Sequence, residues 1–172
     1  MSEPAHITVH LHGDPKYLAG VREMVASVAR RLGFDELSCS QLALAVDEAL
    51  CNVIRHGYQG QDERPIWIRI WPEPLESLKS DAPPGIRVVI EDEAAQVDPA
   101  AMQGRELDDV RPGGLGVHII REVMDEAIYE KRSGGVGMSL TLIKRGNVTP
   151  TVGAQGPTQG PKGNASCGND PA

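Results

Sequence analysis

Residues 47–60 read DEALCNVIRHGYQG, and the pattern in this stretch decides the fold that the sequence predicts. Glu48 lies four residues before Asn52, so a helix places the carboxylate and the carboxamide on one stripe. Apolar neighbours set this stripe beside the buried face. Two interpretations stay open from the pattern alone. One is a paired carboxylate at the helix edge. The other is a site where Asn52 offers an oxygen to a hard cation and Glu48 acts as a base or a water-mediated ligand.

The apolar period around this stretch predicts a helix over 37–55, which Gly57 and Gly60 terminate. An amphipathic helix is predicted before it, over 16–32, and another helix begins at Gly114 and runs to about residue 126. Alternating apolar residues predict strands over 6–12, 65–71, 86–92, 127–132 and 136–145. This order predicts an α+β fold, a two-layer α/β sandwich in which the helices cover one face of a mixed, largely antiparallel sheet.

Length and composition predict one folded domain, residues 1–146, and a disordered tail, 147–172, rich in Gly, Pro, Thr, Ser and Asn.

The net charge of −7 argues against direct binding of nucleic acid. The sequence has neither a signal-peptide pattern nor an apolar run of about 20 residues, so we expect no membrane attachment. The cysteines have no metal-ligand spacing, which favours free thiols in a reducing cytoplasm: Cys39, Cys51 and Cys167.

Two further stretches carry residues suited to binding a nucleotide. In RPGGLGVHII, residues 111–120, glycines directly precede a predicted helix, and glycine lets backbone N–H groups approach an anion. Such a turn is also typical of a simple connection. In VVIEDEAAQVDP, residues 88–99, Asp92 lies at the end of a buried strand, where a carboxylate can accept a hydrogen bond from an exocyclic amine such as that of adenine. An ordinary acid at a strand exit is the alternative.

Taken together, these stretches resemble the GHKL ATPase superfamily with its Bergerat-type ATP-binding fold, and most nearly the bacterial anti-sigma-factor serine/threonine kinases. DEALCNVIRHGY looks like the N box of that family, and GGLGVHIIREVMDE looks like its second glycine box and the adjoining helix. The resemblance extends over residues 6–145. It implies ATP and Mg²⁺ as cofactors, with Asn52 holding the metal, Glu48 acting as general base toward a serine hydroxyl, and Asp92 binding the adenine amine.

The resemblance also implies further contacts to the nucleotide, under a mobile lid drawn from 99–113. These candidate residues are Arg55, His56, Ala94, Gln96, Gly113, Gly114, Leu115, Gly116 and Val117. For Arg55 and His56, a solvated helix end is the competing interpretation. Arg22 corresponds to an arginine that the family carries on its first helix, facing protein partners; an ordinary exposed arginine is the alternative.

The function that the resemblance implies is phosphorylation of a serine on a small antagonist protein, which regulates a sigma factor or a response regulator. A homodimer is implied as well. The sequence departs from the family at its first glycine box, where Ala94 and Gln96 stand at glycine positions, although Asp98 and Pro99 match the residues usual directly after this box. This departure supports an alternative: a non-catalytic binding module of the same fold that sequesters a regulator and binds ATP weakly or not at all. A nucleotide-binding part of a larger signalling assembly also stays open.

Overall fold

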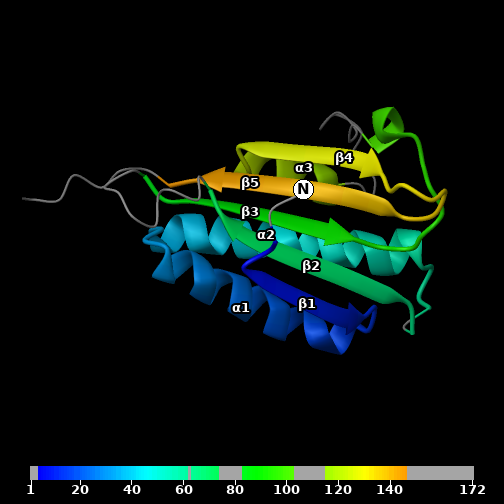
Figure 1. Ribbon diagram of the computed structural model, residues 1–172, viewed down its shortest axis with the longest axis horizontal. Helices are drawn as coiled ribbons and strands as arrows, with labels where there is room; N and C mark the ends of the chain where they lie inside the picture. The colour runs from blue at the N-terminus through cyan, green and yellow to red at the C-terminus, as the bar shows by residue number, and fades with distance from the viewer. Residues whose placement is uncertain (1–3, 62, 74–82, 103–114, 147–172) are drawn as a thin grey trace, which may run out of the picture.

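The computed structural model describes residues 4–61, 63–73, 83–102 and 115–146, which form two layers. One layer is a five-stranded sheet, and α-helices cover a single face of it (Figure 1). The strands take the order β1-β2-β3-β5-β4 across the sheet, and each neighbouring pair is antiparallel. The predicted α+β fold is therefore confirmed. The bounds of the strands are β1 Ile7–His12, β2 Pro65–Pro72, β3 Gly85–Glu91, β4 Glu126–Lys131 and β5 Met138–Arg145.

Alternation of apolar and polar residues along the strands directs one face of the sheet into the core. Val9, Ile68, Ile90 and Leu140 lie side by side across four strands. On strand β2, which has a neighbour on each side, Ile66, Ile68 and Ile70 are at most 1% exposed. With an aromatic content of only 3%, the chain builds its core mainly from aliphatic side chains.

The helical layer consists of α1 (Leu18–Arg31), α2 (Glu36–Asn52) and α3 (Leu115–Val123), with α2 packed against both of the others. The segment Glu36–Gly57 is long and apolar enough to cross a membrane by length and composition alone. Half of the apolar stretch in this segment is nevertheless buried inside the protein, as expected for a core helix. The residues of α2 that are buried are Ser38, Cys39, Leu42, Ala43, Ala45, Val46, Ala49 and Leu50.

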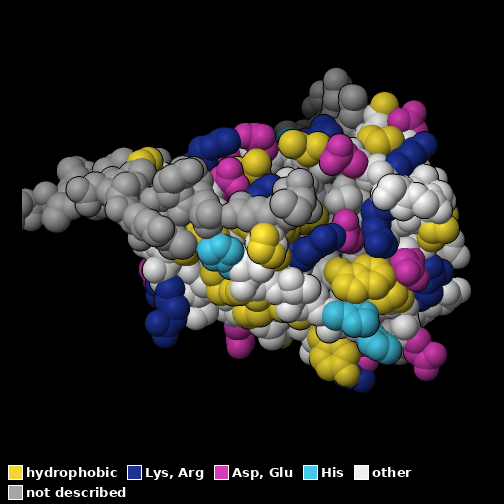
Figure 2. Space-filling model, in the orientation of Figure 1, with side chains coloured by type: hydrophobic (Ala, Val, Ile, Leu, Met, Phe, Trp, Pro, Cys, Tyr) yellow, Lys and Arg dark blue, Asp and Glu magenta, His cyan; other side chains and the backbone are white. Residues whose placement is uncertain are grey.

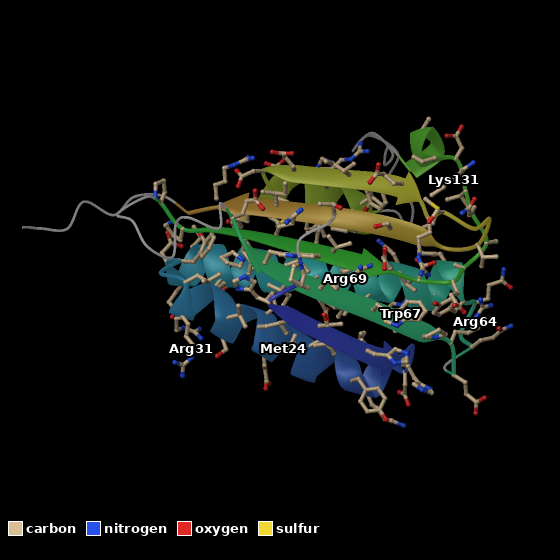
Figure 3. The ribbon with its side chains drawn as sticks, viewed as in Figure 1. Met24, Arg31, Arg64, Trp67, Arg69 and Lys131 are labelled. Atoms are coloured by element: carbon tan, nitrogen blue, oxygen red, sulfur yellow. The ribbon has the colours of Figure 1, made fainter. Side chains whose placement is uncertain are left out.

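Among the described residues, no helix covers the other face of the sheet, where side chains of the strands lie at the surface (Figure 2). Trp67 lies on this face together with Arg69 (Figure 3). The ring of His10 stacks on Trp67 with centroids 5.4 Å apart, and the Arg132 guanidinium lies 4.9 Å from the Trp67 centroid. Arg69 forms a salt bridge with Glu91 on the neighbouring strand. Paired charges and aromatic stacking thus keep this face from presenting a bare apolar surface.

The helices differ from the sequence prediction mainly at their ends. The predicted helix 16–32 begins with a 3₁₀ turn, Pro15–Tyr17, before α1, and the predicted helix 37–55 passes at Val53 into a π-helical turn, Val53–Gly57. The last helix ends at Val123 and not near residue 126, because the N–H of Asp125 bonds to the carbonyl of Ile143 and draws the chain into the sheet. The Lys144 ammonium donates to the carbonyl of Val123 at 2.7 Å and caps this helix end. The predicted tail, 147–172, lies outside the described residues.

Asp35 caps the N-terminus of α2 and should make the stability of the protein depend on pH. Its carboxylate accepts a hydrogen bond from the backbone N–H of Ser38 at 2.6 Å, and this bond lowers the pKa of Asp35. A carboxyl whose pKa is lowered by folding stabilises the protein above its unfolded pKa, about 3.9, and loses this contribution as the pH falls through the folded pKa.

We predict that Asp35→Asn, which can still cap the helix but cannot ionise, removes this pH-dependent contribution. Urea unfolding should find the wild type more stable than the variant at pH 7, with the difference shrinking as the pH is lowered below about 4. Parallel stability profiles for the two proteins across this range would contradict the role assigned to the Asp35 carboxylate.

Candidate functional site

Glu48 and Asn52 lie one turn apart on α2, on the side of the helix that faces α3. Both side chains are half-buried, while Ala45 and Ala49 beside them are fully buried in the core. The core face of α2 therefore fixes the rotation of the helix and with it the direction of the two polar side chains. Asp47, the neighbour of Glu48, faces the other way: its carboxylate lies 3.6 Å from the guanidinium of Arg22 on α1.

Gly116, in the first turn of α3, makes direct contact with this polar pair. A methyl group placed on Gly116 would lie 2.7 Å from Oε2 of Glu48 and 3.2 and 3.3 Å from the amide atoms of Asn52. The absence of a side chain at Gly116 thus lets the N-terminus of α3 approach the carboxylate and the carboxamide. The structure brings together three residues that the sequence placed in two separate motifs.

The chain leaves α2 through the π-helical turn Val53–Gly57, where the N–H of Tyr58 bonds to the carbonyl of Val53 at 2.7 Å. Such turns are often found at functional sites because they change the direction of side chains within a helix. Arg55 and His56 are both exposed on this turn. Gly57 packs against the loop after β3: a methyl group placed on it would lie 2.9 Å from Cβ of Ala94. This contact joins the end of the α2 segment to the loop that begins at Asp92.

Asp92 is 6% exposed, and its carboxylate organises the chain around it. Its Oδ1 accepts hydrogen bonds from the N–H of Ala94 at 2.7 Å and from the N–H of Met138 at 3.1 Å. Both recorded bonds end on the same oxygen, and both come from the backbone. Among the described residues, no donor bonds to the second oxygen of this carboxylate, so it can receive a further donor.

Gln96 stands at a position where the resemblance implies glycine, and its side chain bonds to the backbone of the turn between β4 and β5. The amide nitrogen donates to the carbonyl of Arg132 at 2.8 Å and to that of Gly137 at 3.2 Å. These two acceptors belong to the turn between β4 and β5, so Gln96 ties the loop after β3 to that hairpin. Ala94 is 4% exposed and takes part in the same connection, because its carbonyl accepts the N–H of Gly137 at 2.8 Å.

Two residues that the sequence analysis gave no role support this loop. Tyr58, 2% exposed, donates its hydroxyl to the carbonyl of Pro65 and accepts the N–H of Glu93 at 2.8 Å. Burial raises the pKa of Tyr58 and so keeps the hydroxyl protonated. Gly137 has a φ of +88°, and a methyl group on it would lie 2.0 Å from the carbonyl oxygen of Asp92. Gly137 falls within the predicted strand 136–145, whereas β5 begins at Met138, so the alternating pattern carried no sign of this role.

The other candidate residues are less completely placed. Gly113 and Gly114 lie outside the described residues, as does most of the predicted lid, of which 99–102 form a 3₁₀ turn. Leu115 is 57% exposed and Val117 is half-buried, both in the first turn of α3. Arg22 is exposed on α1, and its guanidinium lies 3.6 Å from the carboxylate of Asp47 on α2.

The residues present fit a magnesium–nucleotide ligand. Mg²⁺ is usually held by one or two protein oxygens together with phosphates and water, so the Asn52 amide is a sufficient protein donor. Within the described part of the chain, His, Cys, Asp and Glu side chains form no group of three or more suited to a metal. The N-terminus of α3 favours negative charge and lies beside Asn52, where phosphates would bind.

The chain is similar in sequence to a known family of proteins. The profile of the histidine kinase-like ATPase domain matches residues 11–144. Serine-protein kinase RsbW of Listeria monocytogenes serotype 4a is 30% identical over 142 residues, which are 80% of this chain and 85% of the relative. RsbW of Bacillus velezensis is 25% identical over 143 residues, covering 82% and 87%.

The fold also recurs in solved structures. The RsbU and RsbW domains of a Mycobacterium tuberculosis protein match with a TM-score of 0.52 at 17% identity, covering 81% of this chain and 32% of that one. The SiaB–SiaC complex of Pseudomonas aeruginosa matches with a TM-score of 0.51 at 13% identity, covering 82% of this chain and 90% of that one.

We predict that Gly116→Ala weakens nucleotide binding without lowering the stability of the fold. The added methyl group requires Glu48 and Asn52 to shift by a few tenths of an ångström, while alanine is the better helix former by about 1 kcal/mol. The variant should unfold at the same or a higher urea concentration and bind Mg-ATP about tenfold more weakly in calorimetry.

Gly20→Ala is the matched control, because a methyl group there meets no atom within 4 Å. It should gain helix stability and leave nucleotide binding unchanged. Equal nucleotide affinity for both variants would show that Gly116 does not contribute to the site.

We also predict that restoring glycine at residue 96 weakens the protein and does not improve its nucleotide site. Gln96→Gly removes two hydrogen bonds to the β4–β5 turn and should lower the free energy of unfolding by about 1 kcal/mol, in addition to the cost of a new glycine. Ala95→Gly, at an exposed neighbour, measures that glycine cost alone. A higher ATP affinity for Gln96→Gly would instead mean that Gln96 crowds the site.

Proposed function

The chain belongs to the family of histidine kinase-like ATPase domains, and from this premise we propose that it is an anti-sigma-factor-like serine/threonine protein kinase acting in the cytoplasm. The single observation that carries the proposal is the meeting of Glu48, Asn52 and Gly116 at the N-terminus of α3. With Glu48 as base, Asn52 as metal ligand and the start of α3 as the phosphate-binding end, the three parts that transfer of a phosphoryl group requires would lie in one place.

Nucleotide binding in this proposal uses both ends of the site. The Asn52 amide oxygen would hold Mg²⁺, which neutralises charge on the phosphates when bound. The first turn of α3, with Gly116 and Val117, would receive the phosphates through backbone N–H groups.

Asp92 would accept the adenine amine on Oδ2, since its hydrogen bonds to described residues engage Oδ1. Gly113, Gly114 and Leu115 would border the phosphates, and Arg55 and His56 would approach them from the π-helical turn.

Ala94 and Gln96 would contribute to the nucleotide site as supports of Asp92. In a glycine-containing loop, the glycines would determine the backbone conformation. Here the hydrogen bonds between this loop and the β4–β5 turn hold the backbone in its conformation. Because these hydrogen bonds hold the loop, the absence of the two glycines is weaker evidence against nucleotide binding.

The reaction would be transfer of the γ-phosphoryl group to a serine of a small antagonist protein. The serine oxygen forms a bond to the γ-phosphorus while the bond to the bridging oxygen of ADP breaks. Glu48 accepts the proton of the serine hydroxyl, and its half-buried carboxylate is held in position by α2. Arg22, exposed on α1, would contact the protein partner, which is the antagonist, a sigma factor or a response regulator.

We predict that two substitutions on α2 separate binding from chemistry. Asn52→Ala should abolish Mg²⁺-dependent ATP binding in calorimetry. Glu48→Gln should keep binding within about threefold and lower phosphotransfer to the cognate antagonist by about 10²–10⁴-fold. Glu122→Gln, the same change at an exposed position of α3, serves as the control and should affect neither measurement.

Two results would contradict the proposal. If the wild type transfers no phosphate from ATP to the antagonist although it binds ATP, it is not a kinase for that partner. If the wild type does not bind ATP at all, the non-catalytic binding module that sequesters a regulator becomes the better description of the chain.

A further inference from the structure

The peptide unit between Asp92 and Glu93 is held at both of its ends by side chains. Its carbonyl accepts a hydrogen bond from Nη1 of Arg132 at 2.7 Å. Its N–H donates to the hydroxyl of Tyr58 at 2.8 Å. Because the C=O and N–H groups of a trans peptide point in opposite directions, the two side chains fix this unit from opposite sides.

The next peptide unit, between Glu93 and Ala94, is held in the same way. Its carbonyl accepts a hydrogen bond from Nη2 of Arg64, which lies directly before β2 (Figure 3). Its N–H donates to Oδ1 of Asp92 at 2.7 Å. Since the N–H of Met138 bonds to the same oxygen, these two backbone donors together set the direction in which Oδ2 of Asp92 points.

Each of the two arginines is itself held by an aromatic ring. The Arg132 guanidinium lies 4.9 Å from the centroid of Trp67, and its Nε lies 3.9 Å from a carboxylate oxygen of Glu91. The Arg64 guanidinium lies 4.9 Å from the centroid of Tyr58. A planar guanidinium that rests on a ring loses little freedom when it donates a hydrogen bond, and a charged donor forms a stronger bond than a neutral one.

The two arginines reach the loop from parts of the chain that are far apart in sequence. Arg64 directly precedes β2, whereas Arg132 directly follows β4. A segment outside the strand ladder keeps a single conformation only when its backbone polar groups find partners. The loop after β3 thus takes its conformation from side chains that belong to two other strands of the sheet.

We propose that Arg64 and Arg132 are positioning residues for recognition of the adenine base. By fixing the two peptide units after Asp92, they hold Oδ2 where it accepts the 6-amino group of the base. They do so in a loop that has Ala94 and Gln96 at the glycine positions. This role rests on the proposed function, because it presupposes a nucleotide site at Asp92.

The experiment compares, by calorimetry with Mg²⁺, the binding of ATP and of purine riboside triphosphate, which lacks only the 6-amino group. The wild type should bind ATP about tenfold more tightly, as expected for one hydrogen bond to a charged acceptor. Arg132→Met and Arg64→Met should each reduce this preference to about threefold or less. Their affinity for purine riboside triphosphate should stay within about threefold of the wild-type value, because Asn52 and Gly116 at the phosphate end are unchanged.

The ratio of the two affinities separates positioning from stability. Partial unfolding lowers the apparent affinity for both nucleotides by the same factor and leaves their ratio unchanged.

Arg87→Met is the matched control, because Arg87 lies toward the end of β3 that is remote from Asp92. Its guanidinium lies 4.5 Å from the centroid of Trp71 and 3.2 Å from a carboxylate oxygen of Glu73, the same combination of ring and acid that Arg132 has. This variant should keep the wild-type preference for ATP.

A combined variant tests whether the arginines act through Asp92. In Asp92→Asn, the oxygen can keep both backbone hydrogen bonds while the amide nitrogen, a donor, takes the place of Oδ2. This change by itself should remove the preference for ATP, and adding Arg64→Met to it should leave the ratio unchanged. A further change in the ratio would mean that Arg64 acts on the base by a route other than Asp92.

The other outcomes that would overturn the role of the arginines differ in what they mean for the proposed function. If the wild type binds neither nucleotide, the proposed nucleotide site fails and the role of the arginines fails with it. If the wild type binds both nucleotides equally, Asp92 does not accept the amine, although the phosphate end of the site stands.

The remaining outcomes leave the nucleotide site intact. If the wild type prefers ATP and either Arg64→Met or Arg132→Met keeps the full preference, that arginine only stabilises the fold. If Arg87→Met lowers the preference as much as Arg132→Met does, the effect belongs to this face of the sheet in general and not to the contacts with the loop.

Discussion

The close approach of α3 to α2 at Gly116 is the contact on which the candidate site depends. A side chain there would occupy the space now filled by the carboxylate of Glu48 and the carboxamide of Asn52. Two conditions permit this approach. The apolar face of α2 fixes its rotation in the core, and the Lys144 ammonium together with the Asp125 backbone ends α3 at a defined position above β5. The site is thus a consequence of how two helices are held on the sheet.

The loop after β3, at the other end of the site, is likewise positioned by a small number of contacts. One carboxylate oxygen of Asp92 holds the backbone on both sides of it, at Ala94 and at Met138. Gly137 must lack a side chain because the Asp92 carbonyl lies so near. Backbone geometry in this region is therefore set by hydrogen bonds across β3 and β5. That is why the loop keeps an ordered path with Ala94 and Gln96 in place of glycines.

The spacing of apolar residues and the residue types at turns were enough to predict the order of the helices and strands. Aliphatic residues recur at every second position in the strands and about every three and a half positions in the helices. The pairing of Glu48 with Asn52 also came from helical spacing. Helix ends were less predictable: α3 stops where Asp125 finds a backbone partner on β5, which is a tertiary contact. The direction of the Gln96 side chain could not be derived either, because its acceptors, the carbonyls of Arg132 and Gly137, lie about 40 residues further along the chain.

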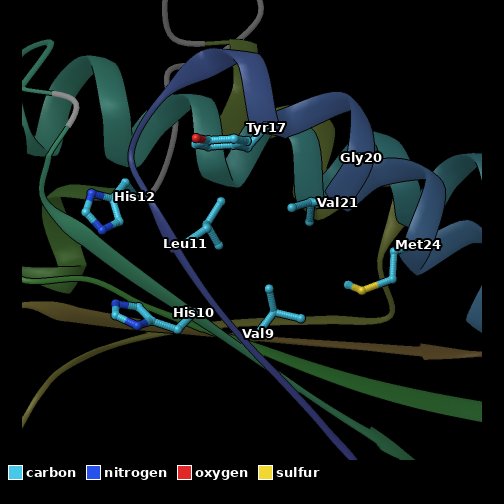
Figure 4. Close-up of a pocket in the computed structure, with 8 residues that line it drawn as sticks. All are labelled: Val9, His10, Leu11, His12, Tyr17, Gly20, Val21 and Met24. Carbon is cyan, nitrogen blue, oxygen red and sulfur yellow. The ribbon is translucent and has the colours of Figure 1, made fainter.

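The candidate site and a cavity beside β1 lie at different places in the fold. The candidate site lies between α2 and α3, whereas the cavity lies between β1 and α1 (Figure 4), at the border of the sheet opposite β4. Arg22 on α1 faces Asp47 of α2 and does not line this cavity. Helix α1 therefore presents two separate surfaces, one toward α2 and one toward β1, and neither includes the contact of Gly116 with Glu48 and Asn52.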